Sequence, residues 1–467
     1  MSASQDIVIG AGMGGLAAAI ALARAGNHVT VIEARDKVGG LAGGVDFGER
    51  RYDGGPYILL DRPGLTWAFE QLGADIEALL HFLPVDEAYR VRWPDGSRVS
   101  IYRELDKTVD HLEAEFRGSG LAYRSYIEHM ATTYDRLAPL QRQDRPGPLS
   151  LLFGGLFREI PFLLRGLEHH LNSTGLPQRV IDALAIWTHI AGQPLSEAPA
   201  PLAFVPPIIH THGAWIVQGG IRRIPEVLEN LARACGVSFR LGERVERIVR
   251  DGRRILGVEI GSERISADRV FSNAAGVGTY AELLSPPDAD LNSRLTALPL
   301  QSPGVAAYLD IEAEADLPFL QFWLPASGTA GPTEKCRVLV HPAAVDGTRI
   351  GNARLVSPTD HTWAAGVGEP GQTELLNQML GEDWWHQGIR KHTVLDTRIP
   401  QSWGRKYHLY RDSMNPVMTA KFMRQGRIPH HSPVADNLFL CGSSTHPGQW
   451  VSFCAISGVL AAQSADS

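Results

Sequence analysis

Short apolar runs and glycine-rich turns alternate near both ends of the chain. The run DIVIG at residues 6–10 predicts a buried parallel strand, and the Ala- and Leu-rich stretch behind it predicts a helix that closes at Gly26. A second apolar run, HVTVIE, predicts another strand that ends on Glu33. Residues 437–462 repeat the pattern as an apolar strand, a Gly/Ser/Pro turn and an apolar helix. Strand–turn–helix units of this kind are typical of nucleotide-binding folds.

The middle of the chain carries patterns for two hairpins, a helix and a further strand. Alternating apolar and polar residues on either side of residues 94–96, PDG, predict one hairpin, and the second is expected to turn at residues 251–252. A helix is expected from about residue 224 to residue 234, after a Gly-Gly turn at 219–220. Residues 267–275 predict the strand.

Residues 149–171 form an apolar segment that is interrupted by Arg158, Glu159 and Arg165. These charges are too closely spaced for a helix that spans a bilayer. Three interpretations remain open for the segment. It could line an apolar substrate tunnel, lie on a membrane surface as an amphipathic lid, or form an ordinary buried pair of helices.

Composition narrows the class of protein. The chain has 467 residues, of which 44% are hydrophobic and 20% charged, which suits a globular chain of two domains or one domain with an inserted lobe. The formal net charge is -7 and no basic run is present, which argues against a nucleic-acid partner. The four cysteines form no CxxC pair and no secretory signal precedes the first strand, so we expect reduced thiols and a cytoplasmic protein. Because the histidines lack further ligands at zinc spacing, no metal site is expected.

The N-terminal unit contains the motif GxGxxG at Gly10, Gly12 and Gly15, with Gly14 between them. Gly10 permits a tight turn, Gly12 lets the backbone approach a pyrophosphate, and Gly15 lets helix and strand pack closely. The start of the helix offers free N–H groups and a partial positive charge to the phosphates. Glu33, at the end of the next strand, can accept hydrogen bonds from ribose hydroxyls. This context predicts a dinucleotide site without deciding between FAD and NAD.

The residues beyond this motif carry a more specific pattern. Glu33-Ala34-Arg35 is followed by the pair at 39–40 and by YDGGPYIL at residues 52–59. This pattern resembles the phytoene-desaturase-like branch of the FAD-dependent amine oxidase superfamily. In that family the Gly-Gly turn lies along the FAD pyrophosphate and the second segment, here including Asp53, lies near the isoalloxazine ring. The chain departs from many relatives in having Leu41 where they have Arg, which puts one phosphate or flavin contact in doubt.

The resemblance implies that both chain ends contribute to one FAD site. The backbone at Val245 would contact adenine, and the strand end at Asn273 would lie close to the diphosphate. Pro447-Gly448 would start the last helix, whose positive end would stabilise negative charge on the reduced flavin. The residues expected to contact FAD are Gly10, Gly12, Gly14, Gly15, Glu33, Ala34, Arg35, Gly39, Gly40, Leu41, Gly54, Gly55, Pro56, Tyr57, Val245, Asn273, Gly442, Ser443, Pro447, Gly448 and Val451.

The fold that the resemblance implies is α/β, with a Rossmann-like FAD-binding domain (GR2-type) built from both chain ends, an α+β substrate domain and a helical lid. The FAD-binding domain is expected to comprise residues 1–75, 216–285 and 431–467. The substrate or lid lobe would be residues 76–215, and the sheet of the substrate domain would lie within residues 286–430.

The function implied is that of an FAD-dependent oxidoreductase of the phytoene desaturase type, which passes hydride from an apolar isoprenoid or polyene to flavin N5. One alternative is an FAD-dependent oxidase of another small metabolite, such as an amine, since residues 216–217 replace the aromatic-Pro pair of most relatives. Another is a non-redox isomerase that uses reduced FAD. No catalytic residue is identified, although His446 could be a base or a hydrogen-bonding wall of the pocket. Peripheral membrane contact through residues 149–171 and the oligomeric state remain open.

Overall fold

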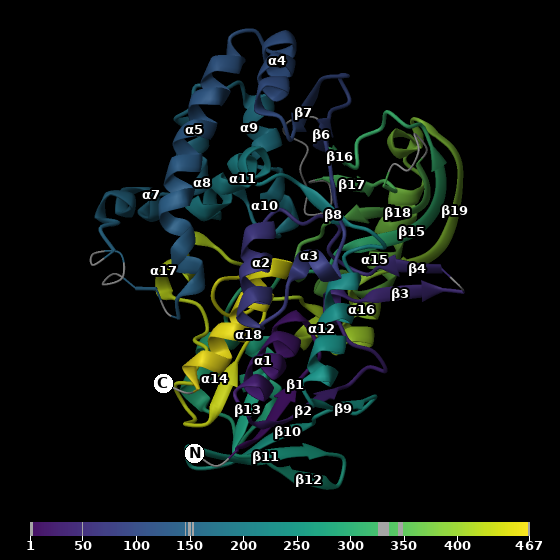
Figure 1. Cartoon of the computed structure of the whole chain (residues 1–467). Helices are drawn as coiled ribbons and strands as arrows, with labels where there is room; N and C mark the ends of the chain where they lie inside the picture. Colours follow the sequence, from purple (N-terminus) through teal and green to yellow (C-terminus); the bar gives the residue numbers. More distant parts are fainter. Residues whose placement is uncertain are drawn as a thin grey trace.

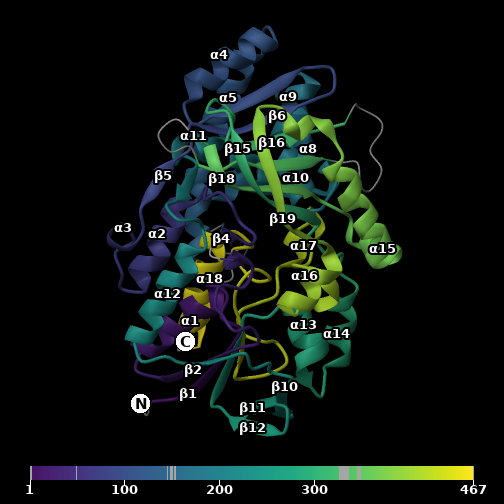
Figure 2. The same ribbon diagram turned by 90° about the vertical axis from the view of Figure 1, so that its right-hand side faces the viewer.

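The computed structural model describes residues 3–48, 50–144, 146–147, 151, 154–325, 336–343 and 349–465. Both termini lie in the lower part of Figure 1, beside a parallel sheet, and a helical lobe and a larger sheet make up the upper part. Seen after a quarter turn, the parts remain stacked one above the other (Figure 2). No described helix is long and apolar enough to cross a membrane.

A five-stranded parallel sheet collects strands from distant parts of the sequence. Its order is β20-β13-β1-β2-β9, and β1 lies at its centre. The sheet therefore joins the predicted first and last strands, as the sequence pattern indicates. Its strands are β1 (Gln5–Ile9), β2 (His28–Glu33), β9 (Ser238–Leu241), β13 (Arg269–Ser272) and β20 (Leu438–Leu440).

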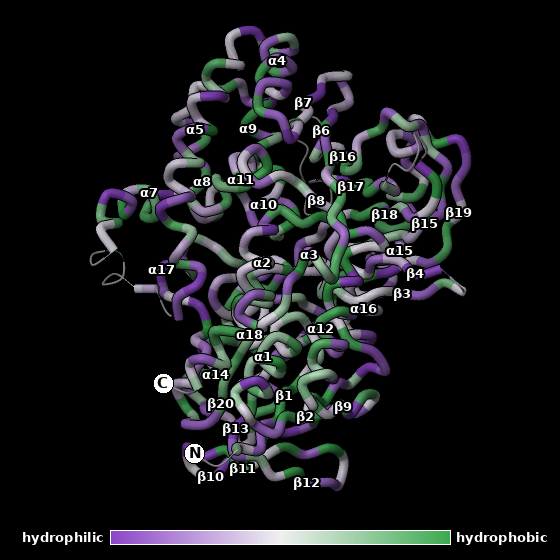
Figure 3. Tube along the Cα trace, in the orientation of Figure 1, coloured by the Kyte–Doolittle hydropathy of each residue, from purple (hydrophilic) through white to green (hydrophobic). Residues whose placement is uncertain are grey.

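The first and last helices pack against each other beside this sheet. Helix α1 (Met13–Arg24) and helix α18 (Val451–Ser464) are hydrophobic along most of their lengths (Figure 3) and largely buried. Small residues allow their close approach, because a Cβ on Gly458 would lie 2.1 Å from the carbonyl oxygen of Gly14. Helices α12 (Arg223–Ala234) and α2 (Arg62–Gln71) pack against α1 and α18, respectively.

The start predicted for the last helix, at Pro447-Gly448, was wrong. The helix begins at Val451, and Pro447 and Gly448 belong to the loop that leads into it. Gly448 adopts a φ of 149°, which is far from helical values. The loop is held by hydroxyl contacts instead, since Thr445 Oγ1 lies 2.5 Å from Ser457 Oγ within the helix.

A seven-stranded mixed sheet forms the larger layer of the upper part. Its order is β19-β15-β18-β17-β16-β6-β7. Strands β6 and β7 form the hairpin predicted around residues 94–96. Fully buried aromatic side chains such as Tyr89, Tyr123 and Phe322 fill the space between this sheet and the helical lobe. The strands are β6 (Glu87–Arg92), β7 (Arg98–Tyr102), β15 (Val305–Ala313), β16 (Leu320–Trp323), β17 (Arg337–Val340), β18 (Arg349–Ser357) and β19 (Ile389–Arg398).

Smaller sheets and the remaining helices complete the described parts. The second predicted hairpin turns at residues 252–253, between β10 and β11. The smaller strands are β3 (Gly44–Phe47), β4 (Arg50–Asp53), β5 (Phe82–Pro84), β8 (Trp215–Val217), β10 (Arg247–Asp251), β11 (Arg254–Ile260), β12 (Glu263–Ser266) and β14 (Leu284–Ser285). The helices of the lobe are α3 (Ile76–Leu79), α4 (Leu105–Glu115), α5 (Ser119–Leu137), α7 (Ile160–Leu164), α8 (Leu167–Asn172), α9 (Gln178–Leu184), α10 (Ile186–Ile190) and α11 (Val205–Thr211). Later helices are α13 (Gly276–Gly278), α14 (Ala289–Thr296), α15 (His361–Leu380), α16 (Pro400–Tyr407) and α17 (Ala420–Gln425).

The apolar segment at 149–171 is divided between core and surface. Its residues 149, 150, 152 and 153 lie outside the described residues. Leu167 and Leu171 are buried in the core of the helical lobe. Phe157 and Leu164, in contrast, are 53% and 60% exposed.

A buried ion pair joins β1 to β13. The guanidinium of Arg269 donates to both carboxylate oxygens of Asp6, from Nε at 2.9 Å and from Nη2 at 2.7 Å. The Asp6 side chain is fully buried and that of Arg269 is 16% exposed. The pair therefore fixes two neighbouring strands of the parallel sheet where water cannot replace either partner.

Replacing Arg269 with Met should destabilise the protein strongly, because the Asp6 carboxylate would stay buried without its charge partner. We expect the free energy of unfolding, measured by urea denaturation, to fall by about 3 kcal/mol. The matched control is Arg253→Met, which breaks a pair with Asp436 whose side chains are 56% and 65% exposed. The control should lose less than about 1 kcal/mol, and equal losses in the two variants would contradict the prediction.

Candidate active site and cofactor site

A cavity of about 520 Å³ lies where the parallel sheet meets the two upper layers. Its volume is in the range of small-molecule binding sites. One end is lined by the carboxyl ends of β1 and β2 and the turns behind them, and the other by apolar residues of the lobe and of the larger sheet. Those apolar residues include Leu59, Leu60, Trp187, Ile190, Leu202, Val205, Val338, Val356 and Trp450.

The first end is shaped by the glycine motif. Gly10 has a φ of 90°, and a Cβ on Gly12 would lie 2.5 Å from Nδ2 of Asn273. Helix α1 begins at this point, and no side chain in the described chain caps it. Its first N–H groups are therefore available to an anion in the cavity.

Glu33 is held in place at the end of β2 by two backbone hydrogen bonds. Oε2 accepts from the N–H of Ala11 at 2.7 Å, and Oε1 accepts from the N–H of Arg35 at 2.9 Å. The residue is 8% exposed and lines the cavity. A fixed carboxylate at this position offers its remaining lone pairs to hydroxyl donors.

Tyr407 and His408, which no sequence motif indicates, also line the nucleotide end of the cavity. The guanidinium of Arg35 lies 4.3 Å from the ring centroid of Tyr407 and donates from Nη1 to the carbonyl of Gly40 at 3.3 Å. His408 follows, and burial together with the nearby Arg244 lowers its pKa. Tyr407 and His408 belong to the stretch after residue 290 that carries no local motif, so only the folded chain brings them to the glycine motif.

The loop at 54–57 crosses the middle of the cavity. Gly55, Pro56 and Tyr57 line it, and burial raises the pKa of Tyr57 to about 12. Arg354 of β18 donates to the carbonyl of Gly55, and its guanidinium lies 5.2 Å from the Tyr57 ring centroid. The hydroxyl of Tyr308 donates to the carbonyl of Gly54 at 2.9 Å. The larger sheet thus holds this loop against the nucleotide end.

Asp53 does not line the cavity, contrary to the position expected near the flavin ring. Its carboxylate accepts from the backbone N–H groups of Ile221 and Arg222, at 3.1 and 3.0 Å, just before α12. A Cβ on Gly220 would lie 2.6 Å from Oδ1 of Asp53, so glycine is needed for this contact. Burial raises the pKa of Asp53, and the two N–H bonds oppose that shift. Asp53 therefore joins the loop to α12.

The C-terminal turn brings the start of α18 to the cavity. Ser443, Val451 and Ser452 line it. Helix α18 begins after Trp450 without a capping side chain among the described residues. Its free N–H groups and positive end therefore face the cavity, as those of α1 do.

His446 is not part of the cavity wall among the described residues, contrary to one of the two roles considered for it. Its Nε2 lies 2.9 Å from the carbonyl oxygen of Leu140. Burial, followed by the neighbouring Arg427, lowers its pKa to about 3. The imidazole connects the C-terminal turn to the helical lobe.

The structure brings together most of the residues expected to contact FAD. Those that line the cavity are Gly10, Gly12, Gly14, Glu33, Ala34, Arg35, Gly39, Gly40, Leu41, Gly55, Pro56, Tyr57, Val245, Asn273, Ser443 and Val451. Those that do not are Gly15, Gly54, Gly442, Pro447 and Gly448. Gly15 packs instead against the Gly10 carbonyl, from which a Cβ would be 2.1 Å away.

The chain matches known proteins along nearly its whole length. The family model described as flavin containing amine oxidoreductase matches residues 13–465. The hydroxyneurosporene desaturase of Cereibacter sphaeroides is 33% identical over 300 residues, which cover 62% of this chain and 60% of that protein. The 4,4'-diapolycopene oxygenase of Methylomonas sp is 25% identical over 497 residues, covering 97% of this chain and 96% of that protein.

A solved structure shows the same fold. An oxidoreductase from Methanosarcina mazei superposes with a TM-score of 0.66 at 16% sequence identity, covering 97% of this chain and 98% of that one. The predicted α/β fold is therefore confirmed. The match at residues 13–465 shows that this chain belongs to the family of flavin-containing amine oxidoreductases and that its cofactor is FAD.

Proposed function

We propose that this protein is an FAD-dependent oxidoreductase of the phytoene desaturase type, which removes hydride from an apolar polyene or isoprenoid. The observation that carries the proposal is the cavity, which is lined by the glycine motif at one end and by apolar side chains at the other. The desaturase and oxygenase with which the chain shares sequence are named for carotenoid substrates, which supports this substrate class.

The residues at the nucleotide end fit FAD. The close packing at Gly12 and Gly14 leaves no room for side chains, so backbone N–H groups of α1 would hold the pyrophosphate. Glu33 would hold the ribose of the adenosine half, and the start of α18 would face the flavin. When bound, FAD supplies a hydride acceptor, and the protein binds, orients and tunes it.

The apolar end would bind the substrate and exclude water. Trp187 lines this end together with Val338 and Val356 of the larger sheet, and its ring centroid lies 5.9 Å from that of Phe322. Hydrocarbon walls of this kind gain free energy by covering an apolar chain. We also propose that the parallel-sheet part (residues 1–75, 216–285 and 431–467) forms the cofactor domain, and that residues 76–215 and 286–430 form the substrate parts.

The exposed residues of the 149–171 segment favour contact with a membrane surface. Phe157 and Leu164 are more than half exposed, and the cation of Arg158 lies between them in the sequence. None of the described residues of the segment lines the cavity, which removes support for a role in the substrate wall. We propose that this surface docks on the bilayer in which an apolar substrate would be dissolved.

Anaerobic reduction of the flavin tests the proposed activity. Phytoene and shorter polyenes in liposomes should bleach the flavin absorbance of the purified protein, whereas a panel of alkyl and aryl amines should not. Bleaching by amines alone would support an amine oxidase instead. Product formation without net oxidation, and only after prior reduction of the flavin, would support an isomerase.

Glu33→Gln should weaken FAD binding, because the amide keeps one acceptor oxygen but removes the charge that strengthens hydrogen bonds from hydroxyls. Losing a charged hydrogen bond costs about 1.5–3 kcal/mol, so the Kd for FAD should rise roughly 10- to 100-fold. The measurement is a fluorescence titration of the apoprotein. Glu229→Gln, on α12 and paired with Arg233, is the matched control, and an unchanged Kd in both would refute the assignment of Glu33.

Leu164→Asp should reduce the fraction of protein that sediments with liposomes, since it places a charge on the exposed surface around Phe157. Each charge at an interface opposes the burial of apolar surface. The control is Leu121→Asp, because Leu121 is 80% exposed on α5 outside this segment. Equal sedimentation of the wild type and both variants would show that the segment does not dock on the membrane.

A further inference from the structure

Three carboxyl groups line the cavity among the residues that the structure describes, and they differ in what they can still bind. They belong to Glu33, Asp61 and Glu282. Both oxygens of Glu33 already accept backbone N–H bonds. Glu282 is exposed and interacts with the cation of Arg244 at the nucleotide end. Asp61 also lines the cavity, and it directly follows Leu59 and Leu60, which belong to the apolar wall proposed to bind the substrate.

The carboxylate of Asp61 is buried, and its two oxygens have different surroundings. Oδ1 accepts the N–H of Gly64 at 2.9 Å and so caps helix α2. Oδ2 faces the hydroxyl of Ser452, at the start of α18, and this hydroxyl stabilises the ionised carboxylate. Neither of these two atoms has another partner within the described structure, and Asp61 is only 2% exposed. Both residues line the cavity, so the pair has bonding capacity left for a ligand or for proton transfer.

The surroundings of Asp61 suit a base. Burial raises its pKa, and the Ser452 hydroxyl, the Gly64 N–H and the side chains of His212 and Arg142 oppose that shift. The hydroxyl of Tyr134 on α5 also interacts with it. A carboxylate with a raised pKa is a stronger base than an ordinary Asp side chain and accepts protons more readily.

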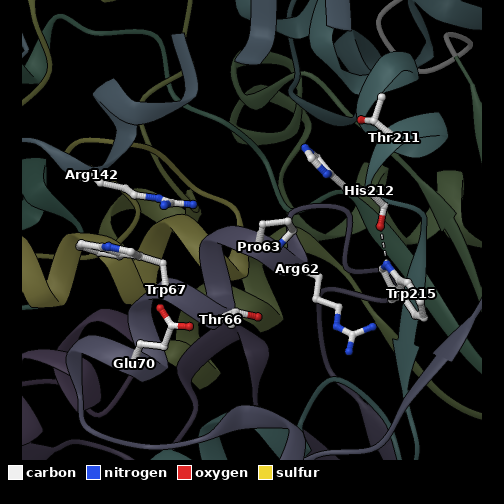
Figure 4. A pocket seen from close by; sticks show the side chains of 9 residues that line it. All are labelled: Arg62, Pro63, Thr66, Trp67, Glu70, Arg142, Thr211, His212 and Trp215. Atoms are coloured by element: carbon white, nitrogen blue, oxygen red, sulfur yellow. Dashed lines mark hydrogen bonds between the residues drawn. The ribbon is translucent and has the colours of Figure 1, made fainter. Parts of the chain in front are cut away.

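A second pocket, open to the surface, is lined by the residues that follow Asp61 in the sequence (Figure 4). Its volume is about 500 Å³, and it begins with Arg62 and Pro63, the residues directly after Asp61. The side chains of Arg142 and His212 extend into it from opposite sides. Its lining residues are Arg62, Pro63, Thr66, Trp67, Glu70, Arg142, Thr211, His212 and Trp215. Asp61 therefore lines the first cavity, while the two residues directly after it line the polar, open pocket.

We propose that Asp61 accepts the proton that the substrate loses during desaturation and releases it to solvent through this surface pocket. The inference rests on the proposed function. As the hydride of one carbon leaves for FAD, the C–H bond on the neighbouring carbon breaks and its proton passes to Oδ2 of Asp61. The electron pair of that bond becomes the second bond of the new double bond. Substrate and FAD thus exchange two electrons, and the carboxylate becomes a carboxylic acid.

Rapid-mixing measurements on the FAD-loaded protein test this role. In Asp61→Asn the amide still caps α2 but cannot accept the proton. We expect the rate of flavin reduction by phytoene in liposomes to fall about 10²- to 10⁴-fold, with unchanged FAD content. The wild-type rate should rise with pH as Asp61 ionises, and the variant should lose this dependence. Asp61→Ser, which keeps a capping hydroxyl, is the second variant if the first fails to fold.

The matched control is Asp288→Asn. Asp288 caps α14 in the same way, by accepting the N–H of Leu291 at 2.9 Å, and is absent from the described cavity lining. The control should reduce its flavin at the wild-type rate and with the wild-type pH profile. A purely structural role of Asp61 as a cap would lower stability in both variants without changing the pH profile of either.

A readout without substrate follows from the raised pKa. The folded protein disfavours the ionised form of Asp61. The free energy of unfolding therefore decreases as pH rises from the usual pKa of Asp through the raised pKa of the folded state. Asp61→Asn removes that penalty. Its thermal midpoint should therefore rise relative to the wild type as pH increases, whereas that of Asp288→Asn should not.

The outcomes separate this inference from the proposed function. If polyenes reduce the wild type and Asp61→Asn equally fast, with the same pH profile, Asp61 is not the proton acceptor and the function stands. If no polyene reduces the wild type, the function and the inference both fall. A slow variant with normal FAD content, a flat pH profile and a pH-dependent gain in thermal midpoint supports the inference.

Discussion

The backbone at the start of α1 passes so close to the C-terminal turn that no side chain fits between them. A Cβ on Gly14 would lie 2.6 Å from the backbone nitrogen of Gly442 and 2.7 Å from Oδ1 of Asn273. Gly442 itself has a φ of 88°, and its N–H donates to Ser457 Oγ at 2.9 Å. Three segments far apart in sequence meet at this one place, and the parallel sheet, the packing of α1 on α18 and the cofactor end of the cavity all depend on it.

The upper layers reach this point through the loop after β4. Asp53 connects the loop to α12, Tyr308 and Arg354 hold it to the larger sheet, and Asp61 ends it by capping α2. Each of these contacts is made to backbone atoms or at a helix start. Together they hold the backbone of the loop in a single conformation. A rigid loop between a nucleotide end and an apolar end is what a reaction between cofactor and hydrocarbon needs, since the two must meet in one geometry.

Local signals made the nucleotide end predictable from the sequence. Spacing and periodicity depend only on neighbours in the chain, and they indicate the glycines of the first turn, Glu33 and the apolar run of β1. Tyr407, Arg354 and Asp61 could not be found in this way, because their roles arise from packing between segments hundreds of residues apart. The same limit explains the errors at Pro447-Gly448 and at His446, where tertiary hydroxyl and carbonyl contacts decided the conformation.

The strand order of the parallel sheet also bears on biosynthesis. The edge strand β20 and the helix after it follow the other four strands in the sequence, yet they complete the cofactor end of the cavity. During translation, β1, β2, β9 and β13 can pair while one edge stays open and α1 lacks its partner helix. The cofactor end is therefore complete only once residue 451 and its helix have been synthesised, and until then the face of α1 that packs on α18 lacks its partner.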